Sequence, residues 1–243
     1  NNSFEVFMDD AGDKISAKSS SWTFGGDVHL NFDEHVNKSV PLYGIGHELI
    51  EKLSDYFLPK NSKCYDIGCS TGTLIAKLAE RHKDKNINFI GCDVETGMID
   101  SAVSKCKGYE NIEFLNQSVT TLELEKCNLI LSYYTIQFIH PSYRQELFKK
   151  IYSSLNWGGA FIFFEKVRAS DARFQDIMTL IYNEYKIDQG YSGNEILAKS
   201  RSLKGILEPF STKANYDLAR RAGFEDVMSI FKCISFEGFL AIK

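Results

Sequence analysis

The sequence lacks the features that mark membrane proteins, zinc proteins and duplex-binding proteins. No apolar run approaches the roughly 18 residues of a membrane span, and no charged-then-apolar leader opens the chain. The six cysteines include no C-x-x-C pair that would hold zinc. A formal net charge of -4 gives no basic field for the phosphates of a long duplex. We expect a soluble protein of a reducing cytoplasm, without a metal site, membrane contact or duplex DNA partner.

What is present suffices for one ordinary folded domain. The 243 residues are 44% hydrophobic and 25% charged, as in typical globular proteins. Residues 1–21 are mostly polar and small, and we expect a flexible N-terminal arm there. Residues 22–243 are expected to form a single domain. The chain starts without a methionine, which leaves open that it is part of a larger polypeptide.

Strand-like and helical stretches alternate through the middle of the sequence. Apolar runs predict strands at 64–67, 89–93, 113–115, 129–133 and 160–164. Helical periodicity predicts helices near 47–57, 73–82, 96–106 and 143–155. Pro59 is expected to end the first helix and Gly158-Gly159 the last. This alternation is typical of an α/β fold whose mostly parallel sheet is covered by helices on both faces.

The C-terminal part breaks this alternation. Residues 227–233 and 238–242 are rich in β-forming residues and nearly adjacent, which predicts an antiparallel hairpin at the sheet edge. The long segment before this hairpin predicts helices near 171–188, 193–206 and 213–222. An insertion of this size, 168–224, is expected to cap a ligand crevice.

The first predicted strand runs into a glycine-rich turn, Asp66 to Thr73. In an open parallel sheet, ligands bind beyond the carboxyl ends of the strands, and the first turn brings backbone closest to them. Gly68 and Gly72 remove Cβ atoms that would hold a ligand away. Asp66 would repel a phosphate but attract a cationic sulfonium, so the turn favours S-adenosylmethionine over a dinucleotide. A plain structural turn is the alternative.

Later strand ends carry further candidate binding residues. Asp93 lies about 25 residues beyond the first glycine, where a carboxylate would accept hydrogen bonds from both ribose hydroxyls. Capping the next helix is its alternative role. Ser118 and Val119 are expected beside the adenine. Their alternative is to form a plain loop that contacts no ligand. Tyr134 would either flank the reactive carbon or pack in the core.

Together with several other segments, these residues give the chain a resemblance to a known family. It resembles the class I S-adenosylmethionine-dependent methyltransferases and, among them, the carboxy-S-adenosylmethionine synthases of bacterial tRNA wobble-uridine modification. The likeness is carried by residues 22–24, 38–43, 65–70, 135–138, 150–152, 155–159, 165–166 and 190–192. It implies a Rossmann-like fold with a seven-stranded, mostly parallel sheet. It also implies S-adenosylmethionine or carboxy-S-adenosylmethionine as cofactor, and a homodimer that uses the inserted helices.

The resemblance also implies roles for individual residues. Tyr43 would reach the methionine part of the cofactor, and Asp93 would bind the ribose. The remaining implied cofactor contacts are Asp66, Gly68, Cys69, Ser70, Gly72, Val94, Ser118, Val119 and Tyr133. The synthases convert S-adenosylmethionine, with prephenate, to a carboxylated cofactor by way of a sulfonium ylide. An arginine in their inserted helices grips the new carboxylate.

The chain departs from the family pattern at that arginine and at three other positions. Without a gap the arginine aligns with Ser200, and a shift of one residue aligns it with Arg201, about 100° away around a helix. Ser118 replaces an expected acid, Tyr133 an expected asparagine and Val94 a polar contact. Either Ser200 or Arg201 would face the cofactor. The candidate catalytic residues are Tyr43, Tyr133 and Arg201.

Three functions follow from the sequence. The first is transfer of a methyl or carboxymethyl group from the sulfonium to a small-molecule or nucleotide acceptor, a reaction that depends mainly on alignment and exclusion of water. Arg201 or Lys166 would hold a donor carboxylate, and the alternative for both is a solvated cation at the surface. His140 or Glu165 would accept a proton, and the alternative for both is a structural role. The second function is the synthase reaction itself. The third is a non-catalytic cofactor-binding module of a larger assembly.

Overall fold

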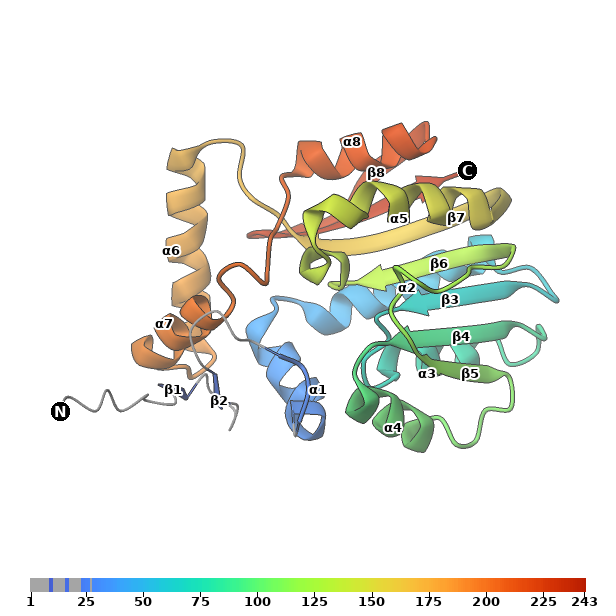
Figure 1. Cartoon of the computed structure of the whole chain (residues 1–243), viewed down its shortest axis with the longest axis horizontal. Helices are drawn as coiled ribbons and strands as arrows, with labels where there is room; N and C mark the ends of the chain where they lie inside the picture. Colours follow the sequence, from blue (N-terminus) through green and yellow to red (C-terminus); the bar gives the residue numbers. More distant parts are fainter. Residues whose placement is uncertain (1–8, 11–15, 18–22, 27) are drawn as a thin grey trace.

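The architecture is a seven-stranded sheet with helices on both faces, in a computed structural model that describes residues 9–10, 16–17, 23–26 and 28–243 (Figure 1). The strands are β3 (Lys63–Ile67), β4 (Asn88–Asp93), β5 (Ile112–Asn116), β6 (Cys127–Tyr133), β7 (Leu155–Lys166), β8 (Asp226–Cys233) and β9 (Phe236–Ile242). Their order is β5-β4-β3-β6-β7-β9-β8, and β9 pairs antiparallel with both β7 and β8. The predicted α/β fold with a C-terminal hairpin is confirmed.

Helices cover the two faces of this sheet. One face carries α2 (Tyr43–Phe57) and α3 (Thr73–Arg81), with α4 (Thr96–Lys105) beside α3. The other face carries α5 (Pro141–Ser154) and α8 (Thr212–Ala222). Successive residues of a strand point to opposite faces, so Phe163 packs under α5 while Phe164 packs on the side of α2. Both rings are fully buried, as expected of a parallel strand between two helical layers.

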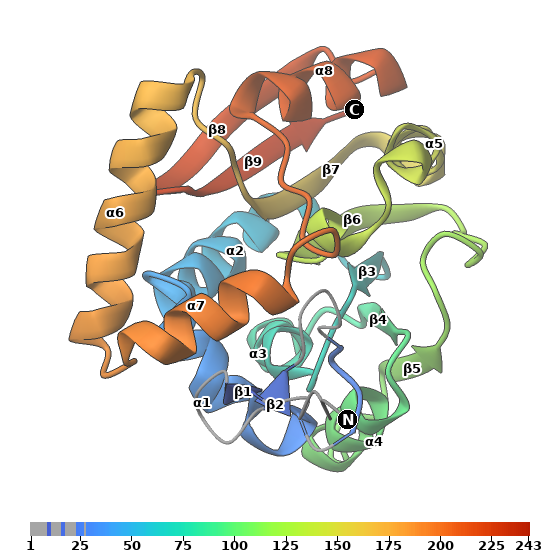
Figure 2. The same cartoon turned by 60° about the vertical axis from the view of Figure 1, so that its left-hand side comes forward.

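The inserted helices α6 (Ala172–Asp188) and α7 (Gly193–Ser202) stand outside these layers. Figure 2 shows α6 at one side of the sheet beside the hairpin, with α7 crossing near α1 (Val28–Ser39). Asp171 caps α6 by accepting a hydrogen bond from the N–H of Phe174, and Ser192 and Glu195 form a capping box on α7. These caps satisfy backbone N–H groups in the first turn of each helix and so define where α6 and α7 begin.

Several predicted boundaries were wrong. The segment Gly158-Gly159 does not end α5, because β7 begins directly at Leu155 and runs through both glycines. Backbone hydrogen bonds from Gly158 N to Lys243 O (2.8 Å) and from Lys243 N to Gly159 O (2.9 Å) hold this extended stretch against the C-terminus. The predicted helix to residue 206 ends at Ser202, shortly before Gly205, whose φ is +79°.

Helix α1 was not predicted. It turns two polar residues, His35 and Ser39, and only one apolar residue, Val36, fully inward. Val28, Phe32 and Val36 recur at helical spacing, but the polar residues between them, two of which are buried, obscure this pattern. Helix α2 starts four residues before its predicted start, after Leu42 in a left-handed conformation (φ 56°).

The N-terminal region is described only in part. Most of the predicted arm, and Trp22, lie outside the described residues. Its described parts, β1 (Asp9–Asp10) and β2 (Ser16–Ala17), pair antiparallel and lie against α7. No helix in the described part of the chain is long and apolar enough to cross a membrane.

Candidate functional site

A cavity of about 770 Å³ lies at the carboxyl ends of the parallel strands. The ends of β3, β4, β6 and β7 contribute to its wall, and α1, α2, α6 and α7 close its sides. Ligand pockets have volumes of roughly 300–1,000 Å³, so this cavity has room for a nucleoside and a second small molecule. Its position is the one that open α/β sheets use for ligands.

The glycine-rich turn after β3 forms one end of this cavity. Gly68, Ser70 and Gly72 all have left-handed φ values, of 75°, 49° and 75°. The N–H of Gly68 donates to Cys92 O at 2.7 Å, which ties the turn to the end of β4. Gly68 and Ser70 line the cavity, but Gly72 does not: a Cβ there would lie 2.9 Å from the Cβ of Ala102 in α4. Gly72 therefore serves helix packing.

Two carboxylates give this end of the cavity a negative character. Asp93 accepts hydrogen bonds from the N–H groups of Ser70 and Glu95, both at 3.0 Å, and borders the cavity. Asp66 is buried, and its Oδ2 has no hydrogen-bond partner among the described residues. Burial, together with the charge of Asp93, raises the pKa of Asp66 to about 7. A cationic ligand would be stabilised beside Asp66 and Asp93 when both carboxylates are charged.

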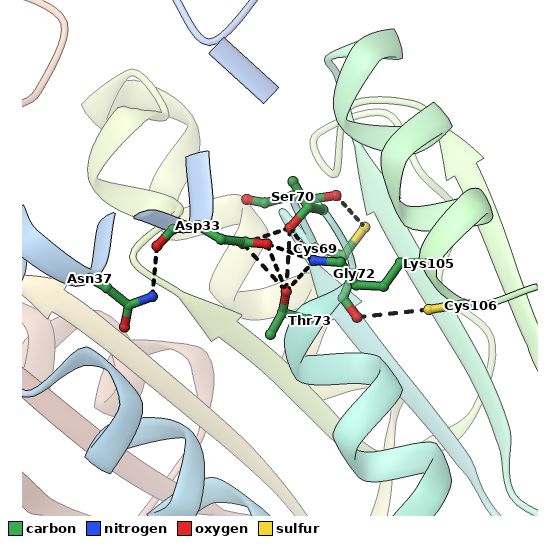
Figure 3. Close-up of polar contacts among 9 residues, drawn as sticks. Asp33, Asn37, Cys69, Ser70, Gly72, Thr73, Lys105 and Cys106 are labelled. Atoms are coloured by element: carbon green, nitrogen blue, oxygen red, sulfur yellow. Dashed lines mark hydrogen bonds and ion pairs between the residues drawn. The ribbon is translucent and has the colours of Figure 1, made fainter. Parts of the chain in front are cut away.

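Asp66 and Cys69 reach a smaller hollow next to the main cavity, which Tyr43 and Tyr133 also border. Its polar side is a cluster around Asp33 of α1, shown in Figure 3. Asp33 Oδ1 accepts from the hydroxyl of Thr71 at 2.8 Å, and Asp33 Oδ2 lies 2.7 Å from Lys105 Nζ. The cluster fastens α1 to the cofactor turn. Asp33 could not be found from the sequence because it precedes the turn by more than 30 residues, in a helix whose apolar pattern is weak.

Tyrosine rings form the middle of the cavity wall. The hydroxyl of Tyr133 donates to Tyr43 O at 2.6 Å, and the two ring centroids lie 4.8 Å apart. A Cβ at Gly46 would lie 2.1 Å from the Tyr133 hydroxyl, so only glycine fits there. Burial raises the pKa of both phenols above the usual value, which keeps them neutral. Tyr134 has a left-handed φ of 61°, borders the cavity and also packs in the core.

The expected adenine contacts, Ser118 and Val119, and the expected cofactor contact Val94 lie on the cavity wall. Val94, Ser118 and Val119 all border the cavity near Asp93. Lys150 donates from α5 to the backbone oxygens of Val119 and two neighbouring residues at 2.8–3.0 Å, which fixes this loop. The structure thus brings these strand ends together, as predicted from the sequence.

The inserted helices supply Ser200, not Arg201. Ser200 of α7 borders the cavity, whereas Arg201 is exposed and absent from its wall. The expectation that Arg201 would hold a ligand therefore finds no support in this geometry. Lys166, considered from the sequence, does border the cavity, and Lys186 of α6, which was missed, joins it.

The two candidate bases have structural surroundings. His140 borders the cavity, but its Nδ1 accepts from the N–H of Ser142 as the cap of α5. Glu165 is buried away from the wall, and burial raises its pKa to about 8. No group of three or more metal-binding side chains occurs among residues that the structure describes.

Comparison with known proteins agrees with this geometry. Residues 65–159 match the family model of a methyltransferase domain. The chain is 38% identical to a carboxy-S-adenosyl-L-methionine synthase of Campylobacter lari, over 90% of this chain and 94% of the relative. It is 35% identical to a synthase of the same name from Staphylococcus epidermidis, over 91% of this chain and 97% of the relative.

Solved structures share the fold at low sequence identity. Human N-acetylserotonin methyltransferase, solved in complex with S-adenosylmethionine, aligns with a TM-score of 0.61 and 16% identity, over 88% of this chain and 55% of that one. An O-methyltransferase family protein from Burkholderia thailandensis gives 0.61 and 13%, over 88% and 59%. The fold is thus that of class I methyltransferases, and the near full-length likeness shows that the chain belongs to the carboxy-S-adenosyl-L-methionine synthase family.

Proposed function

We propose that this protein binds S-adenosylmethionine at the glycine-rich end of the cavity and carboxylates it, with prephenate as the source of the carboxylate. The observation that carries the proposal is the extent of the likeness to the synthases, which spans 90% of the chain. The matched span includes the strand ends and the inserted helices that line the cavity.

The residues at the glycine-rich end fit such a cofactor. Gly68 and Ser70 leave backbone exposed to a ligand, and Asp93 keeps carboxylate lone pairs for ribose hydroxyls besides those that accept from the turn. The unpartnered oxygen of Asp66 suits the positive charge of the methionine part. When bound, S-adenosylmethionine supplies a sulfonium whose methyl carbon is activated.

The chain's own contribution is alignment and exclusion of water. Two of the wall carboxylates are already engaged, Asp93 by backbone N–H groups and Glu208 by Arg168 at 3.7 Å. The neutral phenols of Tyr43 and Tyr133 are poor proton acceptors, and their rings flank the space between the two ends of the cavity. Tyr43 and Tyr133 would thus act by position rather than by proton transfer.

A second candidate function is transfer of a methyl or carboxymethyl group to a small-molecule or nucleotide acceptor. The observation that favours it is the position of Ser200 on the cavity wall, where the synthases are expected to place an arginine. Phe24 and Phe138 also border the cavity, and their rings would suit stacking on a nucleobase.

One experiment separates these functions. The purified protein is incubated with S-adenosylmethionine, with and without prephenate, and the nucleoside products are identified by mass spectrometry. We expect a carboxylated nucleoside only when prephenate is present. Unchanged S-adenosylmethionine in both samples would overturn the synthase function. Formation of S-adenosylhomocysteine on addition of an acceptor would then support the transferase.

The apolar face of α6 supports the further proposal of a homodimer. Its exposed large apolar residues are Phe174, Ile177, Leu180, Ile181 and Ile187. An exposed stripe of this kind is typical of a protein–protein contact. Light scattering should give the mass of a dimer, and the double variant Ile177→Lys, Leu180→Lys should give that of a monomer. A wild-type monomer at micromolar concentration would contradict the proposal.

The six free thiols suit the reducing cytoplasm that we propose as the location of the protein.

A further inference from the structure

The end of the cavity opposite the glycine-rich turn holds two lysines beside one tyrosine ring. Lys166 ends β7, and Tyr182 and Lys186 lie one turn apart in α6. The Nζ of Lys166 is 4.4 Å from the centroid of the Tyr182 ring, and that of Lys186 is 4.5 Å from it. All three residues border the cavity.

Neither lysine has an acidic partner in the part of the chain that the structure describes. No carboxylate oxygen of the described residues lies within 4.0 Å of either Nζ. The nearby Arg168 does have one, since it pairs with Glu208 at 3.7 Å. Burial lowers the pKa of both Lys166 and Lys186 to about 8. The aromatic ring compensates only part of the cost of removing two ammonium groups from water.

The surrounding contacts hold this arrangement in place. The hydroxyl of Tyr182 donates to Ser39 O at 2.7 Å, and its ring meets Phe236 edge-on with centroids 5.2 Å apart. The backbone N–H of Lys166 donates to Gln137 Oε1 at 2.6 Å. The two cations thus stand on a fixed frame built from β7, α6, β9 and the end of α1. A half-buried and a buried lysine without a carboxylate partner among the described residues are typical of a binding site for the opposite charge.

Charge is divided along the cavity in a way that suits two different ligands. Asp93 and Glu95 border the end at β4, and the two lysines border the end at β7 and α6. Strands β3 and β6 separate these ends in the sheet, and the Tyr133 ring lies between them. A cationic ligand is therefore favoured at the first end and an anionic ligand at the second.

We propose that Lys166 and Lys186 form the binding subsite for the carboxylates of a second, small organic dicarboxylate, with Tyr182 fixing the two ammonium groups. Both ammonium groups lie within 4.5 Å of the centroid of one ring, so they are near enough to each other for the two carboxylates of one small molecule. Each contact is a charge-assisted hydrogen bond in a partly desolvated place. Only the choice of prephenate as this dicarboxylate rests on the proposed function.

The test measures prephenate binding by calorimetry in the presence of saturating S-adenosylhomocysteine. We expect Lys166→Met and Lys186→Met each to weaken prephenate binding by about tenfold or more. The affinity for S-adenosylhomocysteine, measured first, should stay unchanged and shows that each variant is folded. The matched control is Lys149→Met, which removes an exposed lysine paired with Glu146 on α5 and should leave both affinities unchanged.

The pH dependence gives a second readout. Wild-type affinity for prephenate should fall as the pH rises through about 8, because the two lysines then lose their charge. Tyr182 stays neutral in this range because burial raises its pKa, and the nearby Arg168 is paired with Glu208 at 3.7 Å. The fall should be shallower in each methionine variant. A merely structural role would weaken binding without changing this slope.

The outcomes distinguish the subsite from the proposed function. If wild type forms the carboxylated nucleoside and the methionine variants keep its KM for prephenate, the subsite is wrong and the function stands. If wild type forms no such product but binds prephenate in a lysine-dependent way, the function is wrong and the subsite stands. Failure of wild type to bind both prephenate and citrate, each of which carries at least two carboxylates, would overturn the subsite.

Discussion

The two ends of the cavity are built in different ways. The end at β3 and β4 is shaped by backbone: Gly68 and Ser70 take left-handed conformations, and Asp93 accepts from the N–H groups of Ser70 and Glu95. The end at β7 and α6 is shaped by long side chains, those of Lys166 and Lys186 around a ring. Backbone geometry recognises the shape of a ligand, whereas the lysines recognise charge. Substitutions at the two ends should therefore affect the two ligands separately.

The largest effect is expected from Asp93→Ala. This change removes the ribose acceptor and the acceptor for Ser70 N, and charged hydrogen bonds contribute about 1.5–3 kcal/mol each. We expect the affinity for S-adenosylhomocysteine, measured by calorimetry, to fall at least about 100-fold. The affinity for prephenate alone should stay within about twofold. Asp84→Ala, at an exposed position, serves as the control. Equal losses for both ligands would break the distinction between the two ends.

A smaller effect, on both ends at once, is expected from Gly46→Ala. The new Cβ would lie 2.1 Å from the Tyr133 hydroxyl, so the ring between the two ends must move. Overpacking of this kind lowers the free energy of unfolding by about 1–3 kcal/mol, which urea denaturation would measure. The matched control is Gly44→Ala in the same helix, where a Cβ meets nothing within 4 Å. The control should be neutral or stabilising by up to about 1 kcal/mol. Equal stability of the two variants would contradict the assigned position of Tyr133.

The negative character of the first end can be tested through pH. Burial and the charge of Asp93 raise the pKa of Asp66 from 3.8 to about 7, so the folded state binds more protons than the unfolded state. Wild-type stability should therefore fall as the pH rises from about 4 through about 7. Asp66→Asn removes this contribution, so its free energy of unfolding relative to wild type should rise by about 2 kcal/mol between pH 5 and 8. Parallel pH profiles of the two proteins would contradict the raised pKa.

The first end could be predicted from the sequence because its residues follow strands in a fixed way. Gly68, Ser70 and Asp93 lie at or just beyond the ends of two short, mostly buried strands, and parallel pairing brings these ends together. Ser118 followed from the next strand by the same argument. Local pattern and sheet topology were sufficient for this part of the fold and site.

The second end could not be predicted in the same way. Lys166 ends a predicted strand and was considered, but Lys186 lies in α6, whose many exposed apolar residues hide which side faces the cavity. Long-range contacts decide that side, among them the packing of Tyr182 against Phe236, more than 50 residues away, and its hydrogen bond to Ser39 O. Gly158-Gly159 misled for a related reason, because pairing with the distant Lys243 keeps both glycines in β7.

Asp33, which was also missed, gives the smallest expected effect and the sharpest test of how far the first end extends. It joins α1 to Thr71 and Thr73 of the turn and pairs with Lys105 at 2.7 Å, with both charged side chains partly exposed. Exposed pairs contribute about 0.2–1 kcal/mol, so Asp33→Asn should weaken S-adenosylhomocysteine binding by only about twofold to fivefold. The loss should shrink at high salt, which screens the pair. Glu34→Gln, which breaks only the surface pair with Lys38, is the control. If both variants bind equally well, α1 covers the turn without shaping it, and the first end is made by β3 and β4 alone.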